Sequence, residues 1–370
     1  MAAPLKDQIS VELVESLASS IKLVHTAFDT TSFVDQVSSG LDALEMKDRI
    51  NLIADTLAGN LPPDYITALA IVVEVAKAET NAWAGWPLCS FVERHGTNDP
   101  EPSLGAMPTL TKLWSCEFAI RPFLDQHLDL TLAHLQRWVH DDDEAVRRLP
   151  SEGTRPLLPW GPRVHKLTES PQIGVDLVSD LRHDPSEVVR RSVANHLNDI
   201  AKFQPDLVVE VLNSWTTEPD PVDDRMVRHA LRTLVKQGNP GALALLGFTT
   251  DPKISIGHFT CAPTHIDIGS PIELSASLTS TSAQHQKLVV DFVVHHLTAS
   301  GSVSSKVFKW TTVDLAPGST VELTKRRMIK QASTRRYHPG VHNVDLQIAG
   351  HRVATSHFEL NLATDHGEPG

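Results

Sequence analysis

A string of residues that occurs twice constrains the fold of this chain more than any other feature of its sequence. HDDDEAVRR at residues 140–148 returns 43 residues later as HDPSEVVRR at residues 183–191, and a weaker copy begins near Asp224. Periods of about 40 residues are typical of HEAT-type proteins, in which paired helices stack and each buries the apolar face of its neighbour. The repeat therefore predicts an all-α, HEAT-like helical-repeat solenoid.

The apolar residues of the first 250 positions have the spacing of helices. Between Ile9 and Phe28 they recur at steps of three and four residues, which places them on one face of a helix. Asp29 and Asp64 precede two further helical stretches as N-caps, and Gly59 ends another. We therefore assign residues 1–250 to the helical-repeat domain.

The pattern changes at about Lys253, where alternation of apolar and polar residues replaces the helical spacing. The segment 287–294 is one of several such stretches rich in Val, Thr and Ser. YHPGVH at residues 337–342 resembles the tyrosine corner of immunoglobulin-like sandwiches. The sequence therefore predicts a small all-β immunoglobulin-like sandwich at 253–362, followed by a disordered tail at 363–370.

Composition argues against several classes of protein. No run of about 18 apolar residues occurs in the 370-residue chain, and no basic patch followed by an apolar block marks a secretory signal. The three cysteines lie far apart and form no CxxC pair, which argues against a disulfide scaffold and a zinc ribbon. We therefore expect a cytoplasmic protein that does not associate with membranes.

The net charge of −12 argues against unspecific coating of nucleic acids, but the charge is uneven. Residues 1–100 contain 6 Lys and Arg against 14 Asp and Glu, so most of the 33 basic residues follow later. The arginines of the repeat strings would line up on one surface of a solenoid, where they form Asp–Arg ladders between repeats or face the phosphates of a nucleic acid. Both interpretations are open for Arg147, Arg148, Arg190, Arg191 and Arg228.

Residues 150–162 interrupt the repeat. Four prolines and two glycines fall in this segment, so we predict that no helix runs through it, although the repeat places a helix there. Such departures are expected at functional sites, and this one presents the carboxylate of Glu152, the cation of Arg155 and the aromatic plane of Trp160. The alternative is a Pro-rich linker in which Trp160 plugs the core.

Residues 110–121 form a second unusual stretch. Glu117 and Arg121 fall within an apolar stripe that has the spacing of one helix face. Because a buried carboxylate must be paired or in use, the simplest interpretation is an ion pair between these two residues. In the alternative interpretation, two glutamates and two tryptophans converge on a cationic ligand by charge attraction and cation–π contact. These four residues are Glu117, Glu152, Trp114 and Trp160.

No motif requires a metal ion or an organic cofactor. His295 and His296 lie in a predicted strand, where successive side chains point to opposite faces and cannot share a metal ion. GxGxxG, P-loop and GxSxG motifs do not occur. Basic clusters at residues 325–327 and 335–336 either touch a phosphate backbone or form a solvated face.

Together these segments resemble the AlkC-type DNA alkylation-repair glycosylases, which are HEAT-like relatives of AlkD. The resemblance rests on the repeat strings, on EFAIRPF at residues 117–123 and on RRLPSEGTRPLLPW at residues 147–160, and it covers the whole helical part. The predicted sandwich is similar to the immunoglobulin-like domain that one AlkC subgroup carries.

The resemblance implies a monofunctional glycosylase that hydrolyses the N-glycosidic bond of cationic methylated bases, chiefly 3-methyladenine and 3-methylcytosine. It also implies that duplex DNA bends sharply around the concave face and that the damaged base is not flipped into a pocket. By position, Glu117 and Glu152 are the catalytic carboxylates, Trp160 packs at the lesion, and Arg148 belongs to the DNA-binding signature. We assign Trp114 to the lesion as well, and assign Arg155, Arg147, Arg190, Arg191 and Arg228 to DNA binding.

This assignment is chemically consistent. A methylated cationic base leaves as a neutral molecule, so the carboxylates need only stabilise an oxocarbenium-like sugar and orient or deprotonate the attacking water. We expect no metal or cofactor, double-stranded DNA as the partner, and a monomer. The alternative, from another class, is a non-catalytic helical-repeat protein that binds DNA or serves as a protein-interaction scaffold.

Overall fold

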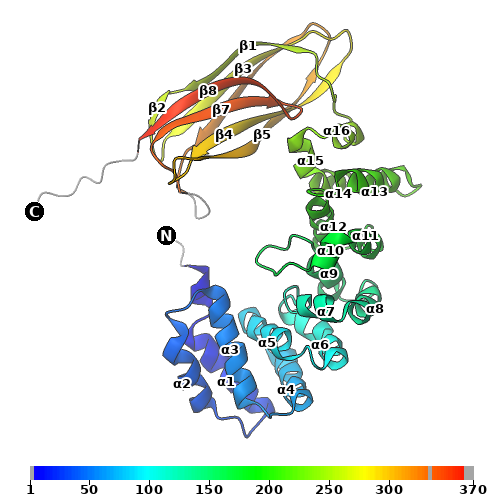
Figure 1. The fold of residues 1–370 in the computed structure, drawn as a ribbon, viewed down its shortest axis with the longest axis vertical. Coiled ribbons are helices and arrows are strands. Elements are labelled where there is room, and N and C mark those ends of the chain that lie inside the picture. Colours follow the sequence, from blue (N-terminus) through cyan, green and yellow to red (C-terminus); the bar gives the residue numbers. More distant parts are fainter. Residues whose placement is uncertain (1–3, 332–335, 362–370) are drawn as a thin grey trace, which may run out of the picture. The chain divides into compact units, whose positions relative to one another are not determined.

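The computed structural model describes residues 4–331 and 336–361, and the chain divides into two compact units (Figure 1). The first unit comprises residues 1–204 and 220–230, and the second comprises residues 205–219 and 231–370. The expected tail at 363–370 lies outside the described residues. Among the helices of the described residues, none is long and apolar enough to cross a membrane.

The first unit is built of helices, as the repeat predicts. The stripe from Ile9 to Phe28 is buried except at Val24. The predicted caps Asp29 and Asp64 each accept a hydrogen bond from the backbone N–H three residues further on, at 3.0 and 2.9 Å. The elements are a 3-10 helix Leu5–Gln8, α1 Val11–Val24, α2 Thr30–Leu41, α3 Met46–Asn60, α4 Tyr65–Ala78, α5 Ala82–His95, α6 Pro100–Leu113, α7 Arg121–Gln126, α8 Leu128–Trp138, α9 Glu144–Gly153, α10 His165–Glu169, α11 Gln172–Ser179, α12 Glu187–Ile200 and α14 Asp224–Ala230.

The repeated string produces the same local structure twice, at the starts of α9 and α12. Arg147 donates a hydrogen bond to the backbone carbonyl of Asp141 at 2.9 Å, and Arg190 donates to that of Asp184 at 2.5 Å. Each of these aspartates also accepts a hydrogen bond from the backbone N–H two residues further on. The helices α9 and α12, and then α12 and α14, pack against each other in succession. The sequence repeat is therefore a structural repeat.

The Pro-rich segment differs in part from the prediction that no helix runs through it. Helix α9 continues through Pro150 and ends only at Gly153. A proline costs a helix one backbone hydrogen bond, but Val146 and Leu149 are fully buried, and this packing stabilises the last turn. The following residues, 154–164, form no helix and are called the Pro-rich loop below.

In its described residues, the second unit contains two β-sheets and three helices. Its three-stranded sheet has the antiparallel order β1-β3-β6, and its five-stranded sheet has the order β2-β8-β7-β4-β5, in which only β2 runs parallel to its neighbour. The elements are α13 Pro205–Thr217, α15 Arg232–Gln237, α16 Pro240–Leu245, β1 Ile254–Ala262, β2 His265–Asp267, β3 Pro271–Ser280, β4 Gln286–Leu297, β5 Val303–Leu315, β6 Thr320–Met328, β7 Gly340–Ile348 and β8 His351–Asn361.

The two sheets enclose one apolar core, to which Leu274, Phe292 and Leu346 contribute fully buried side chains. On β4, His295 bonds to Asp345 whereas the next residue, His296, is buried against Tyr337, so the two histidines point to opposite faces as predicted. Two sheets that face each other across this shared core form the sandwich that the sequence predicts.

Helices α15 and α16 belong to the compact unit of the sandwich. Leu243 and Phe248 pack against Val289 of β4 and Ala349 of the β7–β8 turn. A Cβ on Gly350 would lie 2.3 Å from the Cα of Gly238, so the connection after α15 approaches the β7–β8 turn too closely for a side chain. The compact unit therefore begins before position 250, and its first strand, β1, begins at Ile254.

Candidate active site

Glu152 lies in the last turn of α9 and is almost completely buried. Its Oε1 accepts a hydrogen bond from Arg155 at 2.7 Å, and its Oε2 accepts one from the Ser192 hydroxyl on α12, also at 2.7 Å. Arg155 donates in turn to Asp199 on α12 at 2.9 Å. Packing of one repeat against the next therefore fixes the Glu152 carboxylate from both sides.

Glu117 lies in the turn 114–120 and not on a helix, which corrects the predicted stripe. Helix α6 ends at Leu113 because Trp114 adopts extended backbone angles, and α7 begins only at Arg121. Ser115 donates a hydrogen bond to Glu117 Oε2 at 2.9 Å. Burial raises the pKa of Glu117; the charge of Arg148 opposes this rise in pKa, and the charge of Glu152 adds to it.

The Arg148 guanidinium joins the two glutamates. It lies 3.2 Å from Glu117 Oε2 and 3.5 Å from Glu152 Oε2. The structure therefore brings both predicted carboxylates to one cation, across neighbouring helical layers. Arg148 was assigned to DNA binding, and its half-buried side chain is engaged with these carboxylates.

Arg121 does not form the predicted ion pair with Glu117. Its side chain is 1% exposed and donates to three backbone carbonyls, those of Gly153 at 2.7 Å, Arg155 at 3.0 Å and Pro162 at 2.6 Å. Burial lowers the pKa of Arg121 to about 10, so it remains a cation at neutral pH. Arg121 therefore ties together the two ends of the Pro-rich loop.

Trp160 lies in the Pro-rich loop with its side chain 63% exposed, which excludes the interpretation that it plugs the core. Its φ of +65° is in the left-handed region that side chains other than Gly rarely adopt. The Lys47 ammonium on α3 donates a hydrogen bond of 2.6 Å to the Trp160 carbonyl. The loop thus presents an aromatic plane to solvent from a constrained backbone.

Trp114, the other tryptophan assigned to the lesion, belongs to an aromatic stack. Its ring centroid lies 5.1 Å from Trp86 and 5.0 Å from Trp83, and Trp86 stacks on Phe118 at 5.8 Å. The stack supports the 114–120 turn that carries Glu117. Trp114 is half-buried within it.

The remaining predicted DNA-binding arginines differ in their surroundings. Arg155 is buried between Glu152 and Asp199, and its guanidinium holds both carboxylates, so its contact with DNA stays a prediction. Arg147 forms the inter-repeat ladder with Asp184 at 2.6 Å. Arg228 is half-exposed and 3.6 Å from Asp224.

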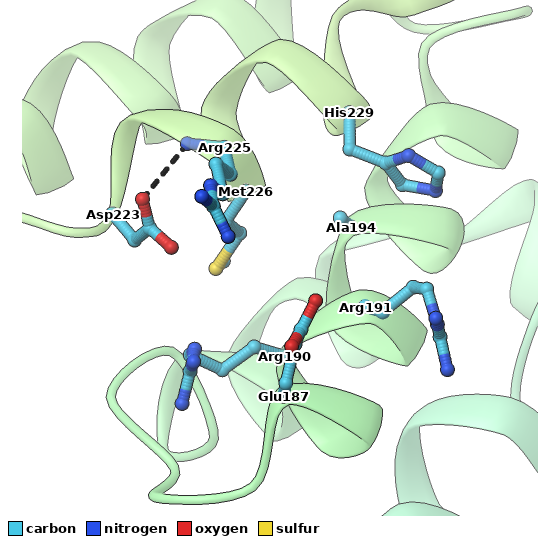
Figure 2. Close-up of a pocket in the computed structure, with 8 residues that line it drawn as sticks. All are labelled: Glu187, Arg190, Arg191, Ala194, Asp223, Arg225, Met226 and His229. Atoms are coloured by element: carbon cyan, nitrogen blue, oxygen red, sulfur yellow. Dashed lines mark hydrogen bonds between the residues drawn. The ribbon is translucent and has the colours of Figure 1, made fainter.

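Arg190 and Arg191 line a pocket of about 120 Å³ between α12 and α14 (Figure 2). Arg225 and His229 of α14 add two basic groups to the pocket lining, and Glu187 and Asp223 add two carboxylates. Arg191 is exposed, so it remains available to a phosphate.

Sequence reasoning missed Ser192, Asp199 and Lys47. Ser192 and Asp199, with His196 between them, have helical spacing and are buried on α12, so a polar stripe on a buried helix face was the available signal. Burial lowers the pKa of His196 to about 4, which leaves it neutral. No local signal marks Lys47, because its partner is 113 residues away.

No group of three or more His, Cys, Asp and Glu side chains that could hold a metal ion occurs in residues 4–331 and 336–361. The polar groups of the site are two glutamates, an aspartate, arginines and hydroxyls.

Fold and site together define a helical-repeat protein with one buried and one half-buried glutamate on a shared arginine and with a C-terminal sandwich. The family described as "Uncharacterised protein YhaZ, C-terminal Ig-like domain" matches residues 255–362. The uncharacterized protein YhaZ of Bacillus subtilis (strain 168) is 33% identical over 359 residues, which cover 97% of this chain and 99% of YhaZ.

Among solved structures, the alkylpurine DNA glycosylase AlkC of Pseudomonas fluorescens, bound to DNA containing an abasic site analog, is 35% identical. It superimposes with a TM-score of 0.90 over 97% of this chain and 100% of AlkC. The chain belongs to the AlkC-type family that includes YhaZ, and the resemblance found in the sequence is confirmed.

Proposed function

We propose that this protein is a DNA glycosylase that hydrolyses the N-glycosidic bond of cationic methylated bases, such as 3-methyladenine and 3-methylcytosine, in duplex DNA. The single observation that carries the proposal is the convergence of Glu117 and Glu152 on Arg148. Membership of the family of AlkC, an alkylpurine DNA glycosylase that was solved bound to DNA, supports it.

The reaction needs negative charge at the sugar more than it needs a proton donor. Because the methylated base already carries a positive charge, it leaves as a neutral molecule while an oxocarbenium-like sugar forms. A preorganised carboxylate stabilises that cation, and a second one accepts a proton from the attacking water. Glu152, held by Ser192 and Arg155, suits the first role; Glu117, whose pKa burial raises, suits the second.

The DNA in this proposal is bent so that the lesion reaches the site without base flipping. Trp160 would pack at the lesion, since its indole is exposed on the Pro-rich loop that follows Glu152. Arg191 would contact the phosphate backbone from the basic pocket of Figure 2. Bending costs several kcal/mol, which backbone contacts offset.

Release of 3-methyladenine from alkylated duplex DNA, and of 3-methylcytosine from an oligonucleotide, tests the proposal. We expect Glu152→Gln and Glu117→Gln to lower the rate at least about 100-fold while DNA binding persists. Glu144→Gln is the matched control, because this exposed glutamate lies on the same helix. A wild-type protein that binds DNA and releases neither base would refute the enzyme and favour a DNA-binding scaffold.

A further inference from the structure

We propose that Lys47 is a positioning residue of this site, which fixes the backbone at Trp160 and thereby the direction of its exposed indole. The inference rests on the proposed glycosylase function, in which Trp160 packs at the lesion. Lys47 lies in the first turn of α3, and its Nζ donates a hydrogen bond of 2.6 Å to the Trp160 carbonyl oxygen.

The backbone of Trp160 needs a specific restraint. A φ of +65° is unfavourable for an L-residue, and Lys47 donates to the carbonyl oxygen of this same residue. Such a conformation persists only where surrounding contacts determine it. Arg121 holds the ends of the Pro-rich loop at Gly153, Arg155 and Pro162, and Lys47 holds its tip.

Lys47 is itself held by the segment that carries Glu117. Its ammonium lies 4.7 Å from the centroid of the Phe118 ring, and Phe118 stacks on Trp86. Burial raises the pKa of Glu93, and the positive charge of Lys47 counteracts this rise. The Glu93 carboxylate therefore balances the charge of Lys47. One side chain therefore connects the tip of the Pro-rich loop to the 114–120 turn, which places Trp160 relative to Glu117.

The test compares wild-type protein with Lys47→Met, Lys47→Arg and a matched control, Lys166→Met. The control removes the same kind of bond, since Lys166 of α10 donates to the Asp125 carbonyl at 2.8 Å. Single-turnover release of 3-methylcytosine measures excision, and binding to a duplex with an abasic-site analogue measures affinity. We expect Lys47→Met to slow release about tenfold, Lys47→Arg to restore most of the rate, and Lys166→Met to leave it unchanged.

A double-mutant cycle with Trp160→Ala separates positioning from a general structural role. When Trp160 is already absent, Lys47→Met should slow release by no more than about twofold. An undiminished effect in that background would overturn the inference. A slope of log K against log salt concentration that is shallower by about one unit in Lys47→Met would also overturn the inference, because it would identify Lys47 as a phosphate contact.

A second measurement does not depend on activity. Chymotrypsin cleaves after exposed tryptophans, and the Lys47 hydrogen bond holds the carbonyl of the peptide bond that would be cut after Trp160. We expect faster cleavage there in Lys47→Met and not in Lys166→Met. Equal cleavage rates would refute the role of Lys47 whether or not base release is observed, whereas absent release by wild-type protein would refute only the proposed function.

Discussion

Replacement of Arg121 by methionine is expected to destabilise the helical unit strongly. Arg121 donates to the carbonyls of Gly153, Arg155 and Pro162, and the first two of these hydrogen bonds are buried. Methionine has a similar length but no donor, so carbonyl groups that water cannot reach would lose their partner. The Pro-rich loop would also lose the contact that joins its two ends.

The magnitude follows from two opposing contributions. Three hydrogen bonds from a charged donor contribute about 5–9 kcal/mol to the free energy of unfolding. Burial opposes this, because the lowered pKa of about 10 for Arg121 corresponds to about 3 kcal/mol of unfavourable burial of the charge. We therefore expect a net loss of about 2–6 kcal/mol, or about 4–24 °C in the melting temperature of a unit of this size.

Thermal melts followed by the helical circular dichroism signal measure this loss. Arg163→Met is the matched control, because this exposed arginine of the same loop makes a single hydrogen bond of 3.1 Å, to the Pro156 carbonyl. Arg163→Met should lower the free energy of unfolding by less than about 1 kcal/mol. If Arg121→Met melted within about 1 °C of Arg163→Met, the reasoning that the buried guanidinium holds the loop would be refuted.

Three further predictions concern the site. Burial raises the pKa of Glu117, so ionisation of this carboxyl group lowers the free energy of unfolding as the pH rises above the ordinary pKa of glutamate. Glu117→Gln should therefore melt at a higher temperature than the wild type at neutral pH and at the same temperature in acid. Equal melting at neutral pH would contradict this. Trp160→Asn should relieve the left-handed strain by up to about 1 kcal/mol while it slows base release, and a lower melting temperature would argue against strain. Arg191→Ala should flatten the slope of log K against log salt concentration for DNA binding by about one unit and leave the melting temperature unchanged. Arg147→Ala breaks the ladder with Asp184, so it should lower the melting temperature and leave the slope unchanged. Slopes equal to that of the wild type in both variants would show that neither arginine contacts phosphate.

The candidate site residues that the sequence singled out are those that violate a local pattern. Glu152 and Trp160 stood out because prolines and glycines interrupt the repeat around them, and Glu117 because it occurs among apolar residues. Their partners violate no pattern. Lys47 and Asp199 are ordinary charged residues in helices, and only the packing of distant segments brings them to the Trp160 carbonyl and to Arg155.

By itself, the sequence determined that helices precede strands, where the repeats lie and which residues are unusual, because these depend on the spacing of neighbours along one element. The tertiary structure decided the rest. Arg147 and Arg148 are adjacent and chemically identical, yet one bonds to the next repeat's Asp184 and the other joins Glu117 to Glu152. Successive residues of a helix point in directions about 100° apart, so each arginine meets whatever the fold has placed on its side. Those neighbours come from distant segments, whose positions no local spacing records.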